Sequence, residues 1–488
     1  MTKILEFIHG IVWGAPTLVL ILGTGAYLTL RSGFAQLRLF IPAVKHFFSG
    51  QSQEHSGETS PFRALCTALA ATVGTGNIAG VAGAIAIGGP GAIFWMWISA
   101  LLGMMTKFAE ATLAVHYRVK QGTEYLGGPM YMIQNGLGQK WAWLAWLYCF
   151  FGVVASFGVG NLTQINAVVS GIHQVMRCYG MEASRFSDLL VGFILAVTMT
   201  AMLLGGAKRI GAAAEMLVPV ASVGYLLMGA VVLILRYDHI PDALCSILQG
   251  AFSPGAVTGG LVGSMLQALR VGVSRGVFTN EAGMGTASIA HASARVSHPA
   301  QQGLMGIMEV FLDTILICTM TALVILCSGI PVSYGIDEGA TLTTNAFSQV
   351  CGGWICVPIA LELCCFAFAT VLGWGLYGAR CAQFLFGASV WKRFAWLQGL
   401  FVLLGAVMNT GIVWQLAEIV NGLMSIPNLI ALAALSPQLL ALTREYISKP
   451  GRKTALGGTY ENFHQCKPLR TLSYEKVPPA GCSGTEAG

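Results

Sequence analysis

The chain has 488 residues, of which 55% are hydrophobic and 10% are charged. Soluble globular proteins carry about a quarter charged residues, so this composition excludes a soluble protein and indicates one that lies in lipid. The formal net charge of +6 does not indicate nucleic-acid binding, because the positive residues follow a membrane pattern.

Long uncharged runs predict membrane-spanning helices, each of which needs about 20 apolar residues. Residues 64 to 106 contain no Asp, Glu, Lys or Arg, and this run is long enough for two helices that meet at Gly88-Gly89-Pro90-Gly91. The fold class is therefore an all-α integral membrane protein. In chain order we predict eleven helices, near residues 11 to 30, 64 to 87, 91 to 117, 141 to 175, 187 to 206, 212 to 235, 255 to 278, 302 to 329, 353 to 379, 394 to 410 and 415 to 443.

The Lys and Arg residues are distributed unevenly over the predicted loops. Of the 27, one set of alternate loops and the C-terminal segment hold 22, the other set holds 4, and Lys107 lies inside a helix. The excess marks the cytoplasmic side. We therefore predict a multi-pass protein of the inner or plasma membrane, with its N-terminus outside and its C-terminus in the cytoplasm.

The second predicted helix carries Gly74-Thr75-Gly76-Asn77 at its middle. Two glycines around a threonine weaken a helix, and inside a membrane a break is tolerated only beside protein or a cavity. If the helix opens here, the amides near Gly76, Asn77 and Ile78 form the N-terminus of a half-helix, which suits a carboxylate. Close packing of small residues between helices is an equally good explanation of the glycines.

A second interruption is predicted in the seventh helix, between Gly272 and Gly285. Broken helices in corresponding positions of two halves indicate a transporter site. Helices 2 to 6 and 7 to 11 form such halves, and because each half has five helices, the second is inverted relative to the first. The predicted organisation is an N-terminal helix and loop (1–62), a first repeat (63–236), a second, inverted repeat (255–443) and a disordered cytoplasmic tail (444–488), whose polar composition cannot bury enough surface to fold alone.

Four segments are specific enough to indicate a family. They are Gly74-Thr-Gly-Asn-Ile-Ala-Gly, Gly88-Gly-Pro-Gly-Ala-Ile-Phe-Trp-Met-Trp, Lys107-Phe-Ala-Glu and Asn280-Glu-Ala-Gly-Met-Gly-Thr-Ala-Ser-Ile-Ala-His-Ala. Together they resemble the alanine/glycine:cation symporter family of the amino acid-polyamine-organocation superfamily. The resemblance implies a LeuT-type fold, with a 5+5 inverted repeat and one additional N-terminal helix. It also implies symport of alanine or glycine with sodium, or in some members with protons.

The resemblance also implies which residues bind the substrate and the ion. Sodium would lie between the carbonyl groups of Ala70 and Val73 and the hydroxyl of Thr370. The substrate pocket would be formed by residues of four core helices, namely Thr75, Gly76, Asn77, Gln164, Gly276, Phe278, Thr370 and Trp374.

The residue types suit these roles, although each also has a structural explanation. Gln164 can bond a substrate without the cost of a buried charge, or it can satisfy the backbone of a neighbouring helix. Trp374 and Phe278 would leave room for a methyl group and little more, or they serve packing alone. The chain departs from the family pattern at Ala369, where Ser or Thr is expected, and at Ala379, where an acidic residue often stands.

Charged residues inside membrane helices indicate function by default. Lys107 and Glu110 are three residues apart, which predicts an ion pair on one helix face. Asp313 and Glu362 lie deeper, and one of them is a candidate proton site. Three further acids lie near predicted helix ends, where they reach water: Glu215, Glu309 and Glu418.

These observations favour a secondary active symporter that imports alanine or glycine, with sodium as the coupling ion and no cofactor. A proton-coupled symporter of a related amino acid such as serine or glutamine, and a passive amino-acid channel, are the alternatives. A membrane-embedded enzyme is not indicated, because the histidines are dispersed and no catalytic motif is present. The thirteen cysteines lack zinc-type spacing and are predicted to be packing residues. The oligomeric state stays open.

Overall fold

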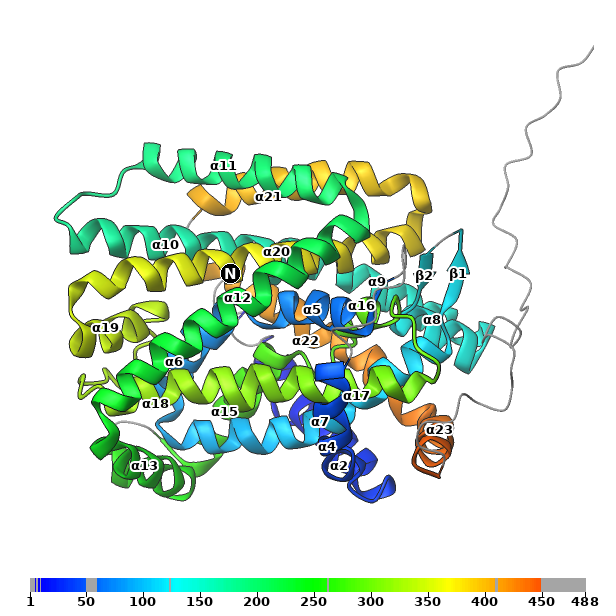
Figure 1. The fold of residues 1–488 in the computed structure, drawn as a ribbon, viewed down its shortest axis with the longest axis horizontal. Helices are drawn as coiled ribbons and strands as arrows, with labels where there is room; N and C mark the ends of the chain where they lie inside the picture. The colour runs from blue at the N-terminus through cyan, green and yellow to red at the C-terminus, as the bar shows by residue number, and fades with distance from the viewer. Residues whose placement is uncertain are drawn as a thin grey trace, which may run out of the picture. The chain divides into compact units, whose positions relative to one another are not determined.

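The computed structural model describes residues 5, 8, 10–49, 59–122, 124–260, 263–408 and 411–448. Helices account for nearly all of this part of the chain (Figure 1), as the apolar runs predict. In the described part, the only strands are β1 (Val119–Gln121) and β2 (Glu124–Leu126), which form an antiparallel hairpin. The all-α fold class is therefore confirmed.

Helices also precede the core, and two of the five core helices that follow are interrupted. The described residues before the core include α2 (Ala15–Arg31), α3 (Ala35–Arg38) and α4 (Phe40–Ser49). The first core helix consists of α5 (Pro61–Thr72), the π-helical turn η2 (Gly76–Gly80) and α6 (Val81–Gly88), and the second is α7 (Gly91–His116). The third to fifth are α9 (Ala142–Phe157) continued by η5 (Gly158–Leu162) and α10 (Thr163–Cys178), then α11 (Arg185–Leu204) and α12 (Gly206–Leu235).

The second half has the same order. Its first helix is broken into α15 (Met265–Asn280) and α16 (Thr286–His291). The next is α17 (Pro299–Val310), continued by the wide turns η7 (Phe311–Cys318) and by α18 (Thr319–Cys327). The last three are α20 (Cys356–Phe386), α21 (Trp391–Val407) and α22 (Gly411–Ala434).

Short elements connect these helices. Between α7 and α9 lie the hairpin, α8 (Pro129–Met132), η3 (Ile133–Leu137) and η4 (Gln139–Trp141). Between the halves lie η6 (Tyr237–His239), α13 (Ile240–Phe252) and α14 (Pro254–Thr258). The second half contains α19 (Ala340–Cys351), η8 (Gly353–Ile355), η9 (Ala388–Val390) and, after α22, α23 (Ser436–Ser448).

The helices form two groups that each combine elements of both halves. In one group α10 packs on α20, and α11 lies alongside α21 (Figure 1). In the other group α7 packs against both α15 and α17. The interrupted helix α5–η2–α6 contacts members of both groups, since α5 packs on α20 and η2 on α15. The first break therefore lies where the two groups meet.

Each predicted span coincides with a helix or a broken helix. Eight helices of the described residues are long and apolar enough to cross a membrane, or ten if each of two bent pairs is one span. The predicted span 255 to 278 is shorter than expected, because α15 begins only at Met265. The predicted span 415 to 443 is bent by 62° between α22 and α23.

Two further expectations change. Arg270 and Arg275 are counted among the 22 positive residues of the cytoplasmic set, but they lie within α15. They therefore do not support the predicted orientation of the chain. The excess of Lys and Arg in the rest of this set is still large. Residues 444 to 448, assigned to the tail, form the last turn of α23. The tail after Ser448 lies outside the described residues.

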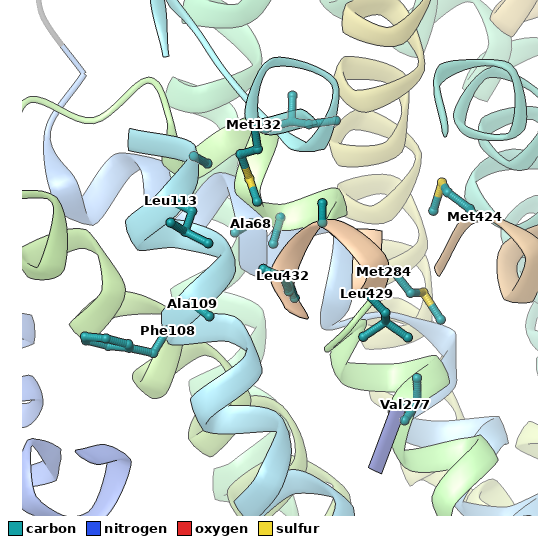
Figure 2. Packing of buried hydrophobic residues seen from close by; sticks show 14 of the residues in the cluster. Ala68, Phe108, Ala109, Leu113, Met132, Val277, Met284, Met424, Leu429 and Leu432 are labelled. Atoms are coloured by element: carbon teal, nitrogen blue, oxygen red, sulfur yellow. The ribbon is translucent and has the colours of Figure 1, made fainter. Parts of the chain in front are cut away.

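The core is built from small and aliphatic side chains of several helices. Figure 2 shows members of one buried cluster that come from different helices, among them Phe108 and Leu113 of α7, Val277 of α15 and Leu429 of α22. By contrast, α11 and α12 expose large apolar side chains, among them Phe186, Phe193, Val220 and Ile234. In a chain of this composition such surfaces face lipid.

Candidate functional site

The break predicted in the first core helix is present. α5 ends at Thr72, Val73 leaves the helical conformation with a ψ of 97°, and the two half-helices are bent by 54°. The four residues from Val73 to Gly76 are buried. A break inside the membrane requires that protein or a bound group satisfies the exposed backbone.

Two backbone amides at this break do not follow the helical pattern. In a continuous helix, Gly74 N–H would donate to the carbonyl of Ala70, but here it donates to Asn77 Oδ1 at 2.8 Å. Likewise Asn77 N–H, which would donate to the carbonyl of Val73, donates to the Gly74 carbonyl at 3.2 Å. The carbonyls of Ala70 and Val73, which are predicted to bind sodium, thus do not receive these usual donors.

Thr370 of α20 faces the same break. Its Oγ1 lies so near Gly74 that a Cβ added to this glycine would be 2.5 Å away. The hydroxyl is buried and has no hydrogen-bond partner among the described residues. This unpaired hydroxyl therefore lies against Gly74, the residue that follows Val73. Neutral oxygen atoms at a broken helix are the type of ligand that coordinates sodium in transporters.

Gln164 of α10 closes another side of the break. Thr75 Oγ1 donates to Gln164 Oε1 at 2.9 Å, and Gln164 Nε2 donates to the Val159 carbonyl at 3.0 Å. Its partner in the predicted pocket, Thr75, is fully buried. Asn166, two residues further along α10, donates at 3.5 Å to the backbone carbonyl of Met408. This contact is one between side chain and backbone of packed helices.

Two aromatic side chains complete the surroundings. Trp374 is 1% exposed, and its Cβ would lie 2.3 Å from a Cβ on Gly160, so only glycine permits this contact between η5 and α20. Its Nε1 has no hydrogen-bond partner within the described chain. Phe278 lies beside Gly76, because its ring carbons would be 3.6 Å from a Cβ at that position. The structure therefore brings Thr75, Gly76, Gln164, Phe278, Thr370 and Trp374 together around one break.

Asn77 lies at the same break, but its side chain has other partners. Its Oδ1 accepts from Gly74, and its Nδ2 donates to Asp313 Oδ1 at 2.6 Å. The carbonyls of Asn77 and Ile78 accept from the hydroxyls of Thr321 and Thr343. The side chain of Asn77 thus holds the shape of the break.

The second break lies further along the chain than Gly276. α15 continues to Asn280 and ends at Glu281, which adopts a left-handed conformation with φ of 55°. The Gly276 carbonyl accepts from the hydroxyl of Thr279 at 2.9 Å. The interruption predicted between Gly272 and Gly285 is therefore present at residues 281 to 285, where Glu281 and two glycines with positive φ, Gly283 and Gly285, end the helix. Residues 276 to 278 still lie within α15.

A carboxylate from another helix supports this second break. Glu110 Oε1 of α7 accepts from Gly283 N–H at 2.9 Å, Gly285 N–H at 3.1 Å and Asn428 Nδ2 at 2.7 Å. The predicted ion pair of Glu110 with Lys107 is wrong. The two charged residues are on one helix, but each turns to a different neighbouring segment.

Lys107 instead pairs with Glu309 of α17. The distance from Nζ to Oε1 is 2.8 Å, and both side chains are fully buried. Glu309 Oε2 also lies 2.9 Å from His291 Nε2, and Gln302 Nε2 lies 2.7 Å from the other ring nitrogen of this histidine. The expectation that Glu309 reaches water is wrong, because its partners come from α7 and α16. No sequence pattern pointed to this contact.

The other acidic residues of the spans differ in burial and in their partners. Glu215 pairs with Arg63 at 2.6 Å, and Glu418 lies 3.3 Å from Arg275, which also contacts Asp337 at 3.3 Å. Asp313 is fully buried, while Glu362 is half-buried on α20 with one oxygen unpaired in the described structure.

A pocket opens at the N-terminal end of α5, away from the break. It is lined by residues of α5, the hairpin, α12, α16 and α20, including Arg63, Thr67, Tyr125, Lys208 and Arg380. The predicted substrate residues lie outside this lining. Arg63 and Lys208 lie in the first turns of α5 and α12 and belong to the larger set of positive residues, so the pocket is on the side predicted to be cytoplasmic.

Comparisons with known proteins identify the family of the chain. Residues 1–456 match the model of the sodium:alanine symporter family. The chain is 42% identical over 452 residues to the sodium/alanine symporter AgcS of Methanococcus maripaludis, which covers 91% of this chain and 97% of that protein. It is 37% identical over 453 residues, 91% of both chains, to the probable sodium/glutamine symporter GlnT of Bacillus subtilis. The crystal structure of MhsT in complex with L-phenylalanine superposes with a TM-score of 0.54 at 15% identity, over 80% of this chain and 99% of that one.

Proposed function

Because the chain belongs to the sodium:alanine symporter family, we propose that it imports small neutral amino acids, alanine and glycine, together with sodium. The chain is a multi-pass membrane transporter with a LeuT-type fold and is not an enzyme. Sodium-coupled amino-acid symport follows from the family, whereas the choice of amino acid is proposed from the residues around the first break.

The observation that carries the proposal is the pair of diverted amides beside the unpaired hydroxyl of Thr370. Sodium would be coordinated by the carbonyl oxygens of Ala70 and Val73 and by the hydroxyl of Thr370. It would thereby join the first core helix to α20. A cation at this place would also stabilise the break itself, because it would take the place of the N–H donors that the carbonyls of Ala70 and Val73 lack.

The substrate would lie on the other side of the break. Its carboxylate would meet the amides at the start of η2, near Gly76, where the helix dipole favours negative charge. Its ammonium group would meet the last turn of α15, around Gly276 and Phe278, which is the negative end of that helix. Thr75, Asn77 and Gln164 would shape the polar side, and Trp374 and Phe278 would limit the side chain to about a methyl group.

The transport cycle would be driven by the membrane potential. With the N-terminus outside, sodium and the zwitterionic amino acid would enter from the outer side and leave through the pocket beside Arg63. The two repeats, residues 63–236 and 255–443, would rock around the site. One net positive charge gains about 2.3 kcal/mol per 100 mV of potential, which is enough to accumulate the substrate.

The alternative is a proton-coupled symporter or one for a larger amino acid such as glutamine. The relative GlnT, named as a probable sodium/glutamine symporter, shows why the family alone does not decide the substrate. Against a large substrate stands the contact of Trp374 with Gly160, which leaves little space beside the break. In a proton-coupled version Asp313 or Glu362 would carry the proton.

The proposal is tested with the purified protein in proteoliposomes. We expect uptake of labelled alanine only with an inward sodium gradient, with net charge movement, and with competition by glycine but not by leucine or methionine. Counterflow, in which trapped unlabelled alanine drives labelled alanine to a higher concentration inside than outside, excludes a passive channel. Uptake that persists when choline replaces sodium and that stops with a protonophore would overturn the sodium mechanism.

A further inference from the structure

Each of the two helix breaks is closed by an asparagine. At the first break, Asn77 Oδ1 accepts from Gly74 N–H at 2.8 Å. At the second, Asn280 Oδ1 accepts from Ala282 N–H at 2.9 Å. Both asparagines are fully buried, and in each the side-chain oxygen satisfies a backbone amide that the break has released.

The amide nitrogens of the two asparagines point to neighbouring residues of η7. Asn77 Nδ2 donates to Asp313 Oδ1 at 2.6 Å, and Asn280 Nδ2 donates to Thr314 Oγ1 at 3.1 Å. Thr314 Oγ1 in turn donates to Asp313 Oδ2 at 2.7 Å. Asp313 and Thr314 are also fully buried.

These five hydrogen bonds form one continuous chain between the breaks. The direction is consistent, since the one hydroxyl proton of Thr314 goes to Asp313 while its lone pair receives Asn280. Asn77 Nδ2 also lies 3.3 Å from both the Asp313 carbonyl and Cys318 Sγ, and its shortest bond is the one to Asp313 Oδ1. Both oxygens of Asp313 accept, as those of an ionised carboxylate do. No water is needed to close it.

We propose that this relay couples the cation site at the first break to the second break, with Asp313 and Thr314 as positioning residues that contact neither sodium nor substrate. The inference rests on the proposed sodium-coupled transport and names the residues that carry the coupling. In the relay, Gly74 N–H is held away from the Ala70 carbonyl only while Asn77 is oriented, and Asn77 is oriented by Asp313. Sodium needs the Ala70 carbonyl free, so its binding favours the orientation of Asn77 that Asp313 holds. Because Asp313 and Thr314 also hold Asn280, sodium binding favours the present arrangement of the second break as well.

Coupling of this kind is measurable as a factor. It is the ratio of alanine dissociation constants without sodium and with saturating sodium, and it must equal the factor by which alanine tightens sodium binding. A residue that serves stability alone lowers the melting temperature and leaves this factor unchanged. A residue of the relay changes the factor, because it transmits the arrangement of one break to the other.

The experiment uses the full-length protein in detergent, with alanine binding measured by calorimetry at zero and at saturating sodium. Thr314→Val has the shape of threonine and removes both relay bonds of the hydroxyl. We expect its coupling factor to fall by about three- to tenfold, the factor that one net hydrogen bond represents. Thr314→Ser restores the hydroxyl and should restore the factor. Thr443→Val is the matched control, because Thr443 is equally buried and donates only to its own helix at Leu439.

If Thr314→Val does not fold, Asp313→Asn provides the same test, since Asn77 and Thr314 donate to different oxygens of Asp313 and asparagine keeps an oxygen at only one of these two positions. A coupling factor of wild-type size in either folded variant would overturn the relay. A wild-type protein whose alanine affinity does not depend on sodium would instead overturn the proposed function, so the two failures are distinguishable.

Discussion

Replacement of Thr370 by alanine separates ion binding from folding. In the described structure, the Thr370 hydroxyl is buried and makes no hydrogen bond, although Gly74 lies against it. Its removal therefore breaks no bond within the protein. If Thr370 instead binds sodium, the substitution removes the only side-chain oxygen among the three proposed ligands, because the neighbouring residue is Ala369.

We expect the substitution to leave the stability of the sodium-free protein almost unchanged and to weaken sodium binding. A buried unpaired polar group costs about 1–3 kcal/mol, and loss of the threonine methyl costs roughly 1 kcal/mol, so the sodium-free variant should be about as stable as the wild type. Loss of one neutral oxygen ligand should raise the half-saturating sodium concentration by about ten- to a hundredfold, where each tenfold step is about 1.4 kcal/mol. Alanine affinity should recover in excess sodium, because the two sites are coupled reciprocally.

The assay is thermal unfolding in detergent across a series of sodium concentrations, together with uptake in proteoliposomes. Sodium should raise the melting temperature of the wild type and of Thr370→Ser, but that of Thr370→Ala only at much higher concentration. Ala369→Ser should strengthen sodium binding if its hydroxyl points toward the same ion. A folded Thr370→Ala protein with the sodium dependence of the wild type would refute the proposed link between the first core helix and α20.

The other predictions concern the pocket wall and the buried charges. Trp374→Ala should weaken alanine binding and admit larger neutral amino acids, and an unchanged competition profile would leave Trp374 with packing alone. Lys107→Met should destabilise the protein by about 3–5 kcal/mol because Glu309 stays buried without its cation; the double variant with Glu309→Gln should recover most of this loss in thermal unfolding, and a single variant of wild-type stability contradicts the pairing. Glu110→Ala leaves the buried amides of Gly283 and Gly285 without this acceptor, each at about 1–3 kcal/mol, while Asn428 keeps its bond to the Gly283 carbonyl; Glu110→Gln keeps an oxygen and should lower the melting temperature much less.

The fold was largely predictable because the solvent of this protein is lipid. A span must be apolar and helical throughout, so the spans follow from composition and length. The first break was predictable for a related reason. Glycine on both sides of Thr75 is unfavourable for a helix that has no water to repair it, and the structure bends by 54° there.

The side-chain partners of the charged residues were not predictable from spacing. Lys107 and Glu110 are three residues apart, and the helix rule predicts their pairing. That rule describes an isolated helix in water, where no third partner competes. In the folded membrane protein, Glu309 offers Lys107 a fully buried carboxylate at 2.8 Å, and the amides at Gly283 and Gly285 offer Glu110 several donors at once.

Most of the buried polar groups around the breaks share one physical purpose. A helix that opens in the membrane releases backbone amides that water cannot reach, and each must find an acceptor. Glu110 accepts from two such amides, Asn77 from a third and Asn280 from a fourth. An acceptor that satisfies an amide also fixes its direction, and a diverted amide leaves a carbonyl that can bind an ion. The same side chains that make the breaks tolerable therefore create the candidate sodium site, so a sequence with the glycines but without these acceptors should form neither.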